Sequence, residues 1–236
     1  MKHSPSRILR KTTKFIWAKK TLAHLESIRQ FELEFSLPVF PNRGKVLEIG
    51  AGTGWQSKKL QELGFDVHAV DLDGSNYKGD RIFPVTDYDG HNIPFSDSTF
   101  DIVFSSNVME HIPHISDFQA EIQRVLKPNG CVIHVVPSSA WRIWTSLSCF
   151  LRTWRIPEIH GEHANNLLAE VFVFRKIFWK QLFEETGWHI VEIRTCRIFY
   201  TGCQIMDRRM NISTRQKLSW LLGGATNLIV LKSKSK

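Results

Sequence analysis

The chain has 236 residues, the length of one domain or of one domain with attachments. Its hydrophobic fraction of 42% is sufficient for a full core, its charged fraction of 23% is ordinary for a soluble protein, and no apolar run is long enough to span a bilayer. The basic start of the chain lacks the apolar segment and the cleavage site of a secretory signal, so we expect a cytoplasmic protein. The net charge of +8 lies partly at the two ends of the chain, which commonly stay solvated but can also contact an anionic membrane or nucleic acid.

Four cysteines lie far apart in the sequence and form no C-x-x-C pair. A structural zinc site needs closer pairing of its ligands, so none is predicted. We expect buried or surface free thiols in a reducing compartment, at Cys131, Cys149, Cys196 and Cys203.

The first part of the chain has the apolar spacing of a helix over residues 14–35, and Pro38 and Pro41 end it. We expect residues 1–40 to form a basic, helical extension that lies against a main domain spanning residues 41–236. Strands and helices then alternate, which predicts an α/β fold with a mostly parallel sheet covered by helices on both faces. The expected strands are 45–49, 65–73, a weaker one near 80–86, 100–106 and 131–137, and the expected helices are 54–64 and 117–130.

The alternation breaks after Pro137, where we expect a helical insertion at about residues 138–170. A helix at 174–187 follows, and two closing strands at 188–200 and 226–234 enclose a helical or loop segment. These elements complete a Rossmann-like sheet of seven strands.

The stretch "VLEIGAGTGWQS", residues 46–57, changes from branched apolar residues to glycines. Glycine permits positive φ and leaves room for a ligand against the backbone, and ligands of parallel sheets bind at the carboxyl ends of the strands. The spacing is G-x-G-x-G, whereas dinucleotide sites prefer G-x-G-x-x-G. Glu48 precedes the turn and would repel a pyrophosphate but attract an ammonium group, so the stretch favours a cationic ligand without phosphate.

Asp71 ends the second predicted strand, 71 − 50 = 21 residues after Gly50. A carboxylate at this distance can accept hydrogen bonds from both hydroxyls of a ribose. Leu72 beside it can pack on an adenine. Asp73 is the less favoured acceptor for the ribose hydroxyls.

Four ordered motifs resemble those of class I S-adenosylmethionine-dependent methyltransferases of the type 11 group: "VLEIGAGTGWQS", "VDLD", "YDGHNIPFSDSTFDIVFSSNVMEHI" and "EIQRVLKPNGCVIHVVP". The resemblance covers about residues 45–137 and implies a methyltransferase with S-adenosylmethionine as its cofactor. Trp55 replaces the usual small residue after the turn. The resemblance implies cofactor-binding roles for Glu48, Gly50, Ala51, Gly52 and Gly54 at the methionine side, Asp71 and Leu72 at the ribose and adenine, Asp89 (with Asp87 as second choice) at the adenine amino group, and Ser106 and Asn107 near the methyl group.

Methyl transfer mainly requires alignment of the acceptor, and a hydroxyl acceptor also profits from a general base. His111 is the first candidate base, with closure of the cofactor pocket as its plainer role, and His114 is a weaker candidate. His160 and His163 in the insertion form a second pair, which with Glu162 could orient sugar hydroxyls or bind a metal, although histidines in loops more often face water. No metal site is predicted.

The insertion also carries an apolar stripe at helical spacing, between residues 141 and 155. The stripe fits a packed lid over the acceptor site, or a helix lying on a membrane surface, because Trp and Arg suit the interface. Its members are Trp141, Trp144, Leu147, Leu151 and Trp154.

The acceptor favoured here is a sugar hydroxyl of a bacterial surface glycan or its lipid-linked precursor, on a loose likeness of "HGEHANN" and "FYTGCQ" to methyltransferases of that sort. Peripheral contact with the inner membrane would suit such an acceptor. The alternatives are another small-molecule or lipid acceptor, an RNA-directed enzyme, and an inactive nucleoside-binding module. Nucleic acid is disfavoured because the sequence shows no RNA-binding module.

Overall fold

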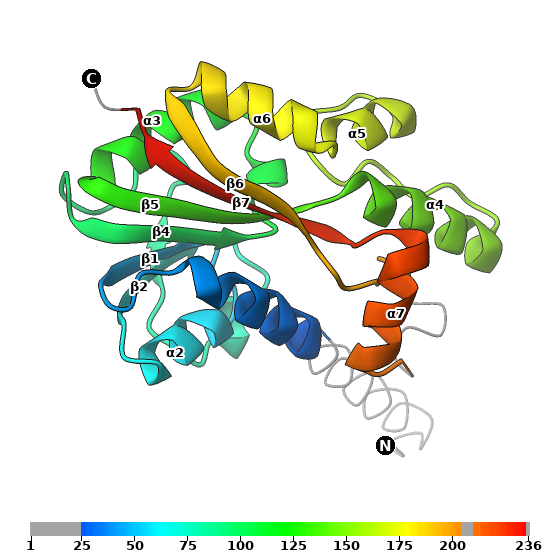
Figure 1. Ribbon diagram of the computed structural model, residues 1–236, viewed down its shortest axis with the longest axis horizontal. Helices are drawn as coiled ribbons and strands as arrows, with labels where there is room; N and C mark the ends of the chain where they lie inside the picture. The colour runs from blue at the N-terminus through cyan, green and yellow to red at the C-terminus, as the bar shows by residue number, and fades with distance from the viewer. Residues whose placement is uncertain (1–24, 204–209, 235–236) are drawn as a thin grey trace, which may run out of the picture.

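A seven-stranded mixed sheet forms the centre of the computed structural model, which describes residues 25–203 and 210–234 (Figure 1). The strand order is β3-β2-β1-β4-β5-β7-β6. The first five strands pair in parallel and β7 runs antiparallel to both of its neighbours. The predicted seven-stranded, mostly parallel Rossmann-like sheet is therefore confirmed. Its strands are β1 (Lys45–Ile49), β2 (Asp66–Leu72), β3 (Thr86–Tyr88), β4 (Phe100–Ser106), β5 (Leu126–Pro137), β6 (Trp188–Cys196) and β7 (Thr226–Ser233).

Helices cover both faces of this sheet (Figure 1). Side chains of α3 and α6 share one core cluster with the strands, while residues 25–36, which are helical, and α2 pack on the other face. The predicted helical insertion after β5 is confirmed by α4 and α5. Along the chain, α7 follows β6 and precedes β7. The helices are α2 (Trp55–Glu62), α3 (Ile115–Val125), α4 (Ser139–Thr153), α5 (Leu167–Val173), α6 (Lys176–Glu185) and α7 (Ile212–Leu222).

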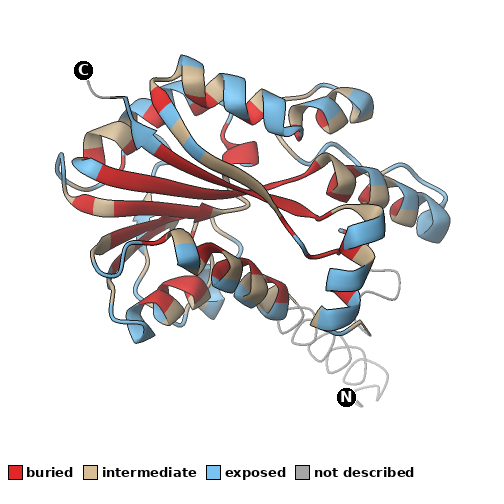
Figure 2. Cartoon of the chain, in the orientation of Figure 1, coloured by how far each residue is buried: buried red, intermediate tan, exposed pale blue. Residues whose placement is uncertain are grey.

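The central strands are buried on both faces, as Figure 2 shows for β1 and β4. Val46 and Leu47 are adjacent and both fully buried, yet they belong to the two different core clusters. Strand side chains alternate between faces, so a doubly covered strand must be apolar at successive positions. This explains the continuous apolar runs of the sequence. Because both faces of the sheet are covered, a site can form only where the strands end, and their carboxyl ends are the usual place.

The largest differences from the predicted element boundaries are at the third strand and at the junction of α3 with β5. The third strand begins at Thr86 rather than near residue 80, because Pro84 has no amide hydrogen to donate to the sheet. Helix α3 ends at Val125 and β5 begins at Leu126, although a helix was predicted up to residue 130. Proline at position 128 disfavours helical backbone at the residue before it.

The prediction for the start of the chain falls partly outside the described residues, which begin at residue 25. Of the predicted apolar stripe, Ile28 is buried and packs in a third core cluster beside Tyr200. Division of the chain at residue 40 stays a prediction.

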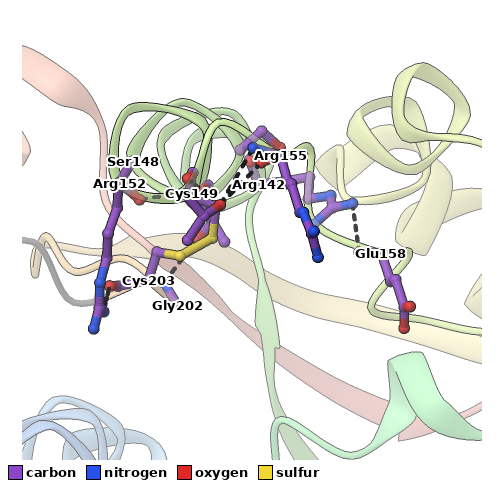
Figure 3. Close-up of a disulfide and its surroundings, with 11 residues drawn as sticks. Arg142, Ser148, Cys149, Arg152, Arg155, Glu158, Gly202 and Cys203 are labelled. Carbon is purple, nitrogen blue, oxygen red and sulfur yellow. Dashed lines mark hydrogen bonds between the residues drawn. A yellow bond between two sulfur atoms is a disulfide. The ribbon is translucent and has the colours of Figure 1, made fainter.

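The expectation of four free thiols is wrong for two of the cysteines. Cys149 of α4 forms a disulfide with Cys203, 54 residues later (Figure 3). Cys131 and Cys196 are free and buried. The pairing depends on the return of the chain after β6 to the side of α4, a tertiary contact that carries no local sequence signal.

Candidate cofactor and acceptor site

A cavity of about 910 Å³ lies at the carboxyl ends of the parallel strands. β1 pairs with β2 on one side and β4 on the other, so the chain order reverses around β1, the place where open α/β sheets bind ligands. A second cavity of about 180 Å³ shares Gly50, Gly52 and Asn107 with the first. Of the candidate residues from sequence, the large cavity is lined by Gly50, Gly52, Asp71, Leu72, Asp89, Asn107, His111, His114 and His160, and the small one adds Ala51 and Ser106.

The glycine turn after β1 has left-handed backbone at Gly50, Gly52 and Gly54, with φ of 69°, 57° and 76°. A Cβ on Gly50 would lie 2.3 Å from Val108 Cγ2, so glycine is required there by contact as well as by backbone angle. The amides of Gly50 and Ala51 donate to the carbonyl of Val70 at 2.9 and 3.1 Å, which ties the turn to β2.

Asp71 lies at the end of β2 and lines the large cavity. Its Oδ2 accepts hydrogen bonds from the Gly52 amide at 3.1 Å and from the Ser75 hydroxyl at 2.7 Å, and its Oδ1 accepts one from the Leu72 amide at 2.8 Å. The carboxylate is therefore held in place by the two loops that border the cavity.

Glu48 stands behind the turn rather than on the cavity wall. It is 2% exposed and accepts a hydrogen bond from the Ser57 hydroxyl of α2. Burial raises the pKa of its carboxyl to about 7. This geometry lets Glu48 brace the turn against α2, so any effect on a ligand passes through the hydrogen-bond network and not through direct contact.

The two candidate aspartates at β3, Asp87 and Asp89, point in different directions. Asp87 points to Arg81 and Lys78, at 2.7 and 2.6 Å, and these cations hold the pKa of its carboxyl below its usual range. Asp89 lines the cavity and accepts hydrogen bonds from the main-chain and side-chain amides of Asn92 and from the main-chain amide of His91, which lower its pKa to about 2. The first choice from sequence, Asp89, is thus the one on the cavity wall.

Ser106 and Asn107 end β4 at the junction of the two cavities. Asn107 has a left-handed φ of 55° and its amide donates to Val135 at 2.7 Å. Trp55 packs against the core on the α2 side and also lines the small cavity. The large side chain is accommodated beside the turn without filling the large cavity.

The four candidate histidines take three different positions. His111 and His160 face each other across the cavity wall with ring centroids 4.6 Å apart, and burial lowers the pKa of both, that of His160 to about 4. His114 lines the cavity near Asp89, where it stacks on His91 and contacts the Gly90 carbonyl at 3.1 Å.

His163 lies away from the cavity: its Nε2 contacts the Met109 carbonyl at 3.2 Å and its ring packs beside Phe178 and Trp179. The sequence pair His160 and His163 is therefore split between the cavity and the core. Glu162 contacts the turn at Met109 and Glu110 through its main chain, since its amide donates to the Glu110 carbonyl at 2.8 Å.

Sequence reasoning missed the cation of the cavity wall. Arg29 borders both cavities and pairs with Glu32, which is fully buried and also accepts hydrogen bonds from the hydroxyls of Tyr200 at 3.1 Å and Thr226 at 2.9 Å. The two hydroxyls that bind Glu32 come from the far end of the chain, so the local sequence pattern does not indicate that Arg29 reaches the cavity.

Trp141 forms an aromatic wall at the end of the cavity that contains His160. It is 8% exposed and its ring lies 4.7 Å from that of His160. The sequence stripe therefore divides: its first residue lines the cavity, whereas Leu147, Leu151 and Trp154 are exposed.

Comparison with known proteins agrees with this geometry. The model of a methyltransferase domain family matches residues 21–193. The chain is 30% identical over 158 residues to a malonyl-[acyl-carrier protein] O-methyltransferase of Legionella pneumophila, with 61% of this chain and 55% of that protein covered. It is 29% identical over 162 residues to a demethylmenaquinone methyltransferase of Paenarthrobacter aurescens, with 64% of each covered. The chain thus spans less than two thirds of the length of either relative.

Among solved structures, a SAM-dependent methyltransferase from Aquifex aeolicus shares the fold, with a TM-score of 0.56, 16% identity and 98% of each chain covered. The family match extends over most of the chain, and the resemblance inferred from the four motifs is confirmed. The chain belongs to the methyltransferase domain family and has the class I fold of S-adenosylmethionine-dependent methyltransferases.

Proposed function

We propose that this protein transfers the methyl group of S-adenosylmethionine to a hydroxyl of a small or lipid-linked acceptor. The observation that carries the proposal is that one cavity, of about 910 Å³, has on its wall both the glycine turn with Asp71 and His111 with Trp141. Its volume lies within the range of about 300–1,000 Å³ usual for ligand sites. One end has the features of a nucleoside site and the other has an aromatic ring and imidazoles, as a two-substrate enzyme requires.

The residues present fit the cofactor. Asp71 would accept hydrogen bonds from the ribose hydroxyls, a role now taken by Ser75 and Gly52. Arg29, which borders both cavities, would neutralise the carboxylate of the methionine part, and Asp89 would receive the adenine amino group. When bound, the cofactor supplies a methyl group already activated by its positively charged sulfur.

At the acceptor end, His111 and His160 lie where an acceptor would meet the methyl group, and Trp141 offers a flat face for a ring. The task of these side chains is alignment, which can supply roughly 7–11 kcal/mol in well-ordered reactions. His114 is nearer the adenine end, and His163 is outside the cavity. We therefore assign contact with the acceptor to the first pair.

A lipid-linked sugar is the acceptor that we favour. Exposed apolar side chains occur on α4, whose Trp141 lines the acceptor end of the cavity, and on α7, and we name them together the α4–α7 surface. The Trp144 indole joins the two helices by donating to the Leu222 carbonyl at 2.8 Å. Figures 1 and 2 show both helices at one end of the molecule with much of their surface exposed. The surface consists of Leu147, Phe150, Leu151, Trp154, Trp220 and Leu221.

The charges around the α4–α7 surface favour an anionic membrane. No acidic residue occurs between residues 122 and 157, whereas Arg152 and Arg155 lie at the end of α4. Arg197 lies over the ring of Trp220 at 4.6 Å. Exposed Trp and Leu beside cations suit a lipid interface, and no helix among the described residues is long and apolar enough to cross the bilayer. The two relatives named above are a demethylmenaquinone methyltransferase and a malonyl-[acyl-carrier protein] O-methyltransferase, and a small-molecule or lipid acceptor is in keeping with these names.

Calorimetry with S-adenosylmethionine and with its demethylated product tests the cofactor half of the proposal, and both should bind. The acceptor half is tested by incubating the protein and labelled cofactor with separate lipid, glycan and RNA fractions. Label should enter the lipid-linked fraction. Label in RNA alone would overturn the acceptor assignment, and absence of cofactor binding would overturn the whole proposal.

A further inference from the structure

Three ligand-type side chains meet at the acceptor end of the cavity. A carboxylate oxygen of Glu110 and one ring nitrogen each of His111 and His160 all lie within 4.8 Å of one another. The distance between His111 Nε2 and Glu110 Oε1 is 3.8 Å. Both imidazoles line the cavity, so the group has one side toward the space where the acceptor would bind.

Glu110 is the unusual member of this group. Its side chain is fully buried, and among the described residues neither carboxylate oxygen has a hydrogen-bond partner. A buried polar group without partners is costly, and a buried charge is more so. Its Oε1 lies 3.8 Å from His111 Nε2, and a carboxylate oxygen lies within 4.8 Å of a ring nitrogen of His160, so this carboxylate stands where it could share an ion with the two imidazoles.

The chain holds the two halves of this group together, although they are 50 residues apart. The amide of Glu162 donates to the Glu110 carbonyl at 2.8 Å, and the amides of His160 and Gly161 donate to Glu170 Oε1 at 2.6 and 2.7 Å. Gly161 permits this close approach, because a Cβ there would lie 2.9 Å from the Glu110 carbonyl oxygen.

Glu170 is itself fixed, since it is fully buried and forms an ion pair with Arg142 of α4. The loop that carries His160 is thereby fastened to the Glu110 turn and, through Glu170 and Arg142, to α5 and α4. A loop whose backbone is anchored on both sides presents its side chain with little freedom, which is what a preformed ligand set needs.

We propose that Glu110, His111 and His160 form a site for a divalent transition-metal cation, with an open coordination position facing the cavity. Two nitrogens and one carboxylate oxygen are the ligands of catalytic zinc sites and of related metals, whereas magnesium prefers oxygen ligands alone. The site therefore takes a cation of the zinc or cobalt type and rejects magnesium.

A consequence for the reaction rests on the proposed function. An acceptor hydroxyl at the open position would lose its proton to solvent more readily, because a bound cation stabilises the oxygen anion. That oxygen would then form its bond to the methyl carbon as the carbon–sulfur bond breaks, with the electron pair left on sulfur. An imidazole bound to the cation keeps no free nitrogen for a proton, so in the loaded protein the two histidines position the ion.

Cobalt provides a test that needs neither cofactor nor acceptor. The full chain without an affinity tag is stripped of metal and titrated with Co²⁺, and the visible absorption of the bound ion is recorded. We expect one equivalent to bind with the spectrum of nitrogen and oxygen ligands, to be displaced by Zn²⁺, and to be unaffected by excess Mg²⁺. A sulfur-to-cobalt charge-transfer band would place the ion at a cysteine and overturn the proposal.

Variants separate this site from binding elsewhere. His160→Ala and His111→Ala, both at partly exposed positions, should weaken Co²⁺ binding by at least ~100-fold, beyond the ~10–100-fold typical of losing a supporting residue. His163→Ala is the matched control, three residues along the same loop but outside the group, and should bind within about twofold of the natural chain. Equal affinity in all three variants, or no binding by the natural chain, would overturn the site. Because no methyl transfer is measured, failure of the proposed function leaves this result readable.

Discussion

The main-chain amide of Gly52 donates a hydrogen bond to Asp71 Oδ2 at 3.1 Å, and this bond joins the glycine turn after β1 to the end of β2. The bond links the two sequence features from which a nucleoside site was predicted. It also means that the aspartate is oriented before any ligand arrives, so little side-chain freedom would be lost on binding.

Replacement of Asp71 by alanine should weaken binding of S-adenosylmethionine by at least about tenfold, because a hydrogen bond to a charged group is worth roughly 1.5–3 kcal/mol. Calorimetry measures the change. Asp73→Ala is the control, since Asp73 lies two residues away, pairs with Lys78 and does not line the cavity. Unchanged affinity in Asp71→Ala would remove this carboxylate from the site.

Gly50→Ala should abolish cofactor binding and lower thermal stability, because the new Cβ would lie 2.3 Å from Val108 Cγ2. Gly64→Ala is a matched control: its φ of +92° imposes the same kind of backbone strain, but nothing lies within 4 Å of the added Cβ. Thermal melts of the two variants separate strain from collision.

The double variant Gly50→Ala with Val108→Ala relieves the collision alone and should recover part of the stability lost in Gly50→Ala. A double variant no more stable than Gly50→Ala would show that the contact with Val108 is not what excludes a side chain at this position.

The sequence predicted the parts of the molecule that depend on neighbours along the chain. Burial on both faces makes β1 and β4 continuously apolar, and left-handed backbone requires glycine at Gly50, so the sheet and the glycine turn could be recognised from local pattern. Asp71 could be found because the strand–turn–helix–strand unit has a nearly constant length.

The parts that sequence reasoning missed are contacts between distant segments. Arg29 reaches the cavity from the first helix, held by a carboxylate that also binds Tyr200, and the pairing of Cys149 with Cys203 crosses 54 residues. His160 and His163 looked equivalent in the sequence, but anchoring of the loop at Glu110 turns only the first into the cavity. These contacts and orientations depend on tertiary packing, which produces no periodic pattern in the sequence.

His111→Ala should lower the rate of methyl transfer by about 10²-fold while changing cofactor affinity much less, because the ring lines the acceptor end of the cavity, where it would align the acceptor directly or through the proposed ion. Steady-state rates and calorimetry give the two quantities. His163→Ala, with its ring among Phe178 and Trp179, is the control for loss of a histidine. Full turnover by His111→Ala would refute a role at the acceptor.

The α4–α7 surface should bind vesicles that contain anionic lipid. Trp154 is 77% exposed and Leu151 is 61% exposed, and replacing both with serine should reduce flotation with such vesicles several-fold, since each buries apolar area in the interface. Leu63→Ser is the control, because this leucine is 56% exposed at the end of α2, outside the proposed surface. Flotation equal to that of the natural chain, or equal loss in the control, would exclude the surface as the membrane contact.

Glu48 should make the protein less stable as pH rises toward neutrality. Burial raises the pKa of its carboxyl from 4.5 to about 7, so the folded state keeps a proton that the unfolded chain has already released. The stabilising effect is complete below the lower value and is lost as pH rises through the higher one. At about 1.4 kcal/mol per pKa unit, the free energy of unfolding should fall by on the order of 3 kcal/mol over this interval from Glu48 alone.

Glu48→Gln removes the titration while keeping an oxygen for the Ser57 hydroxyl, so its free energy of unfolding should decrease less than that of the natural chain between about pH 5 and pH 8. Urea unfolding at several pH values measures both slopes. Asp89→Asn is the opposite case, because hydrogen bonds from its own loop lower the Asp89 pKa to about 2 and its contribution is lost only as pH falls toward that value. If Glu48→Gln and the natural chain lose stability in parallel across this range, the buried carboxyl keeps no proton near neutrality and the brace behind the glycine turn is a charged one.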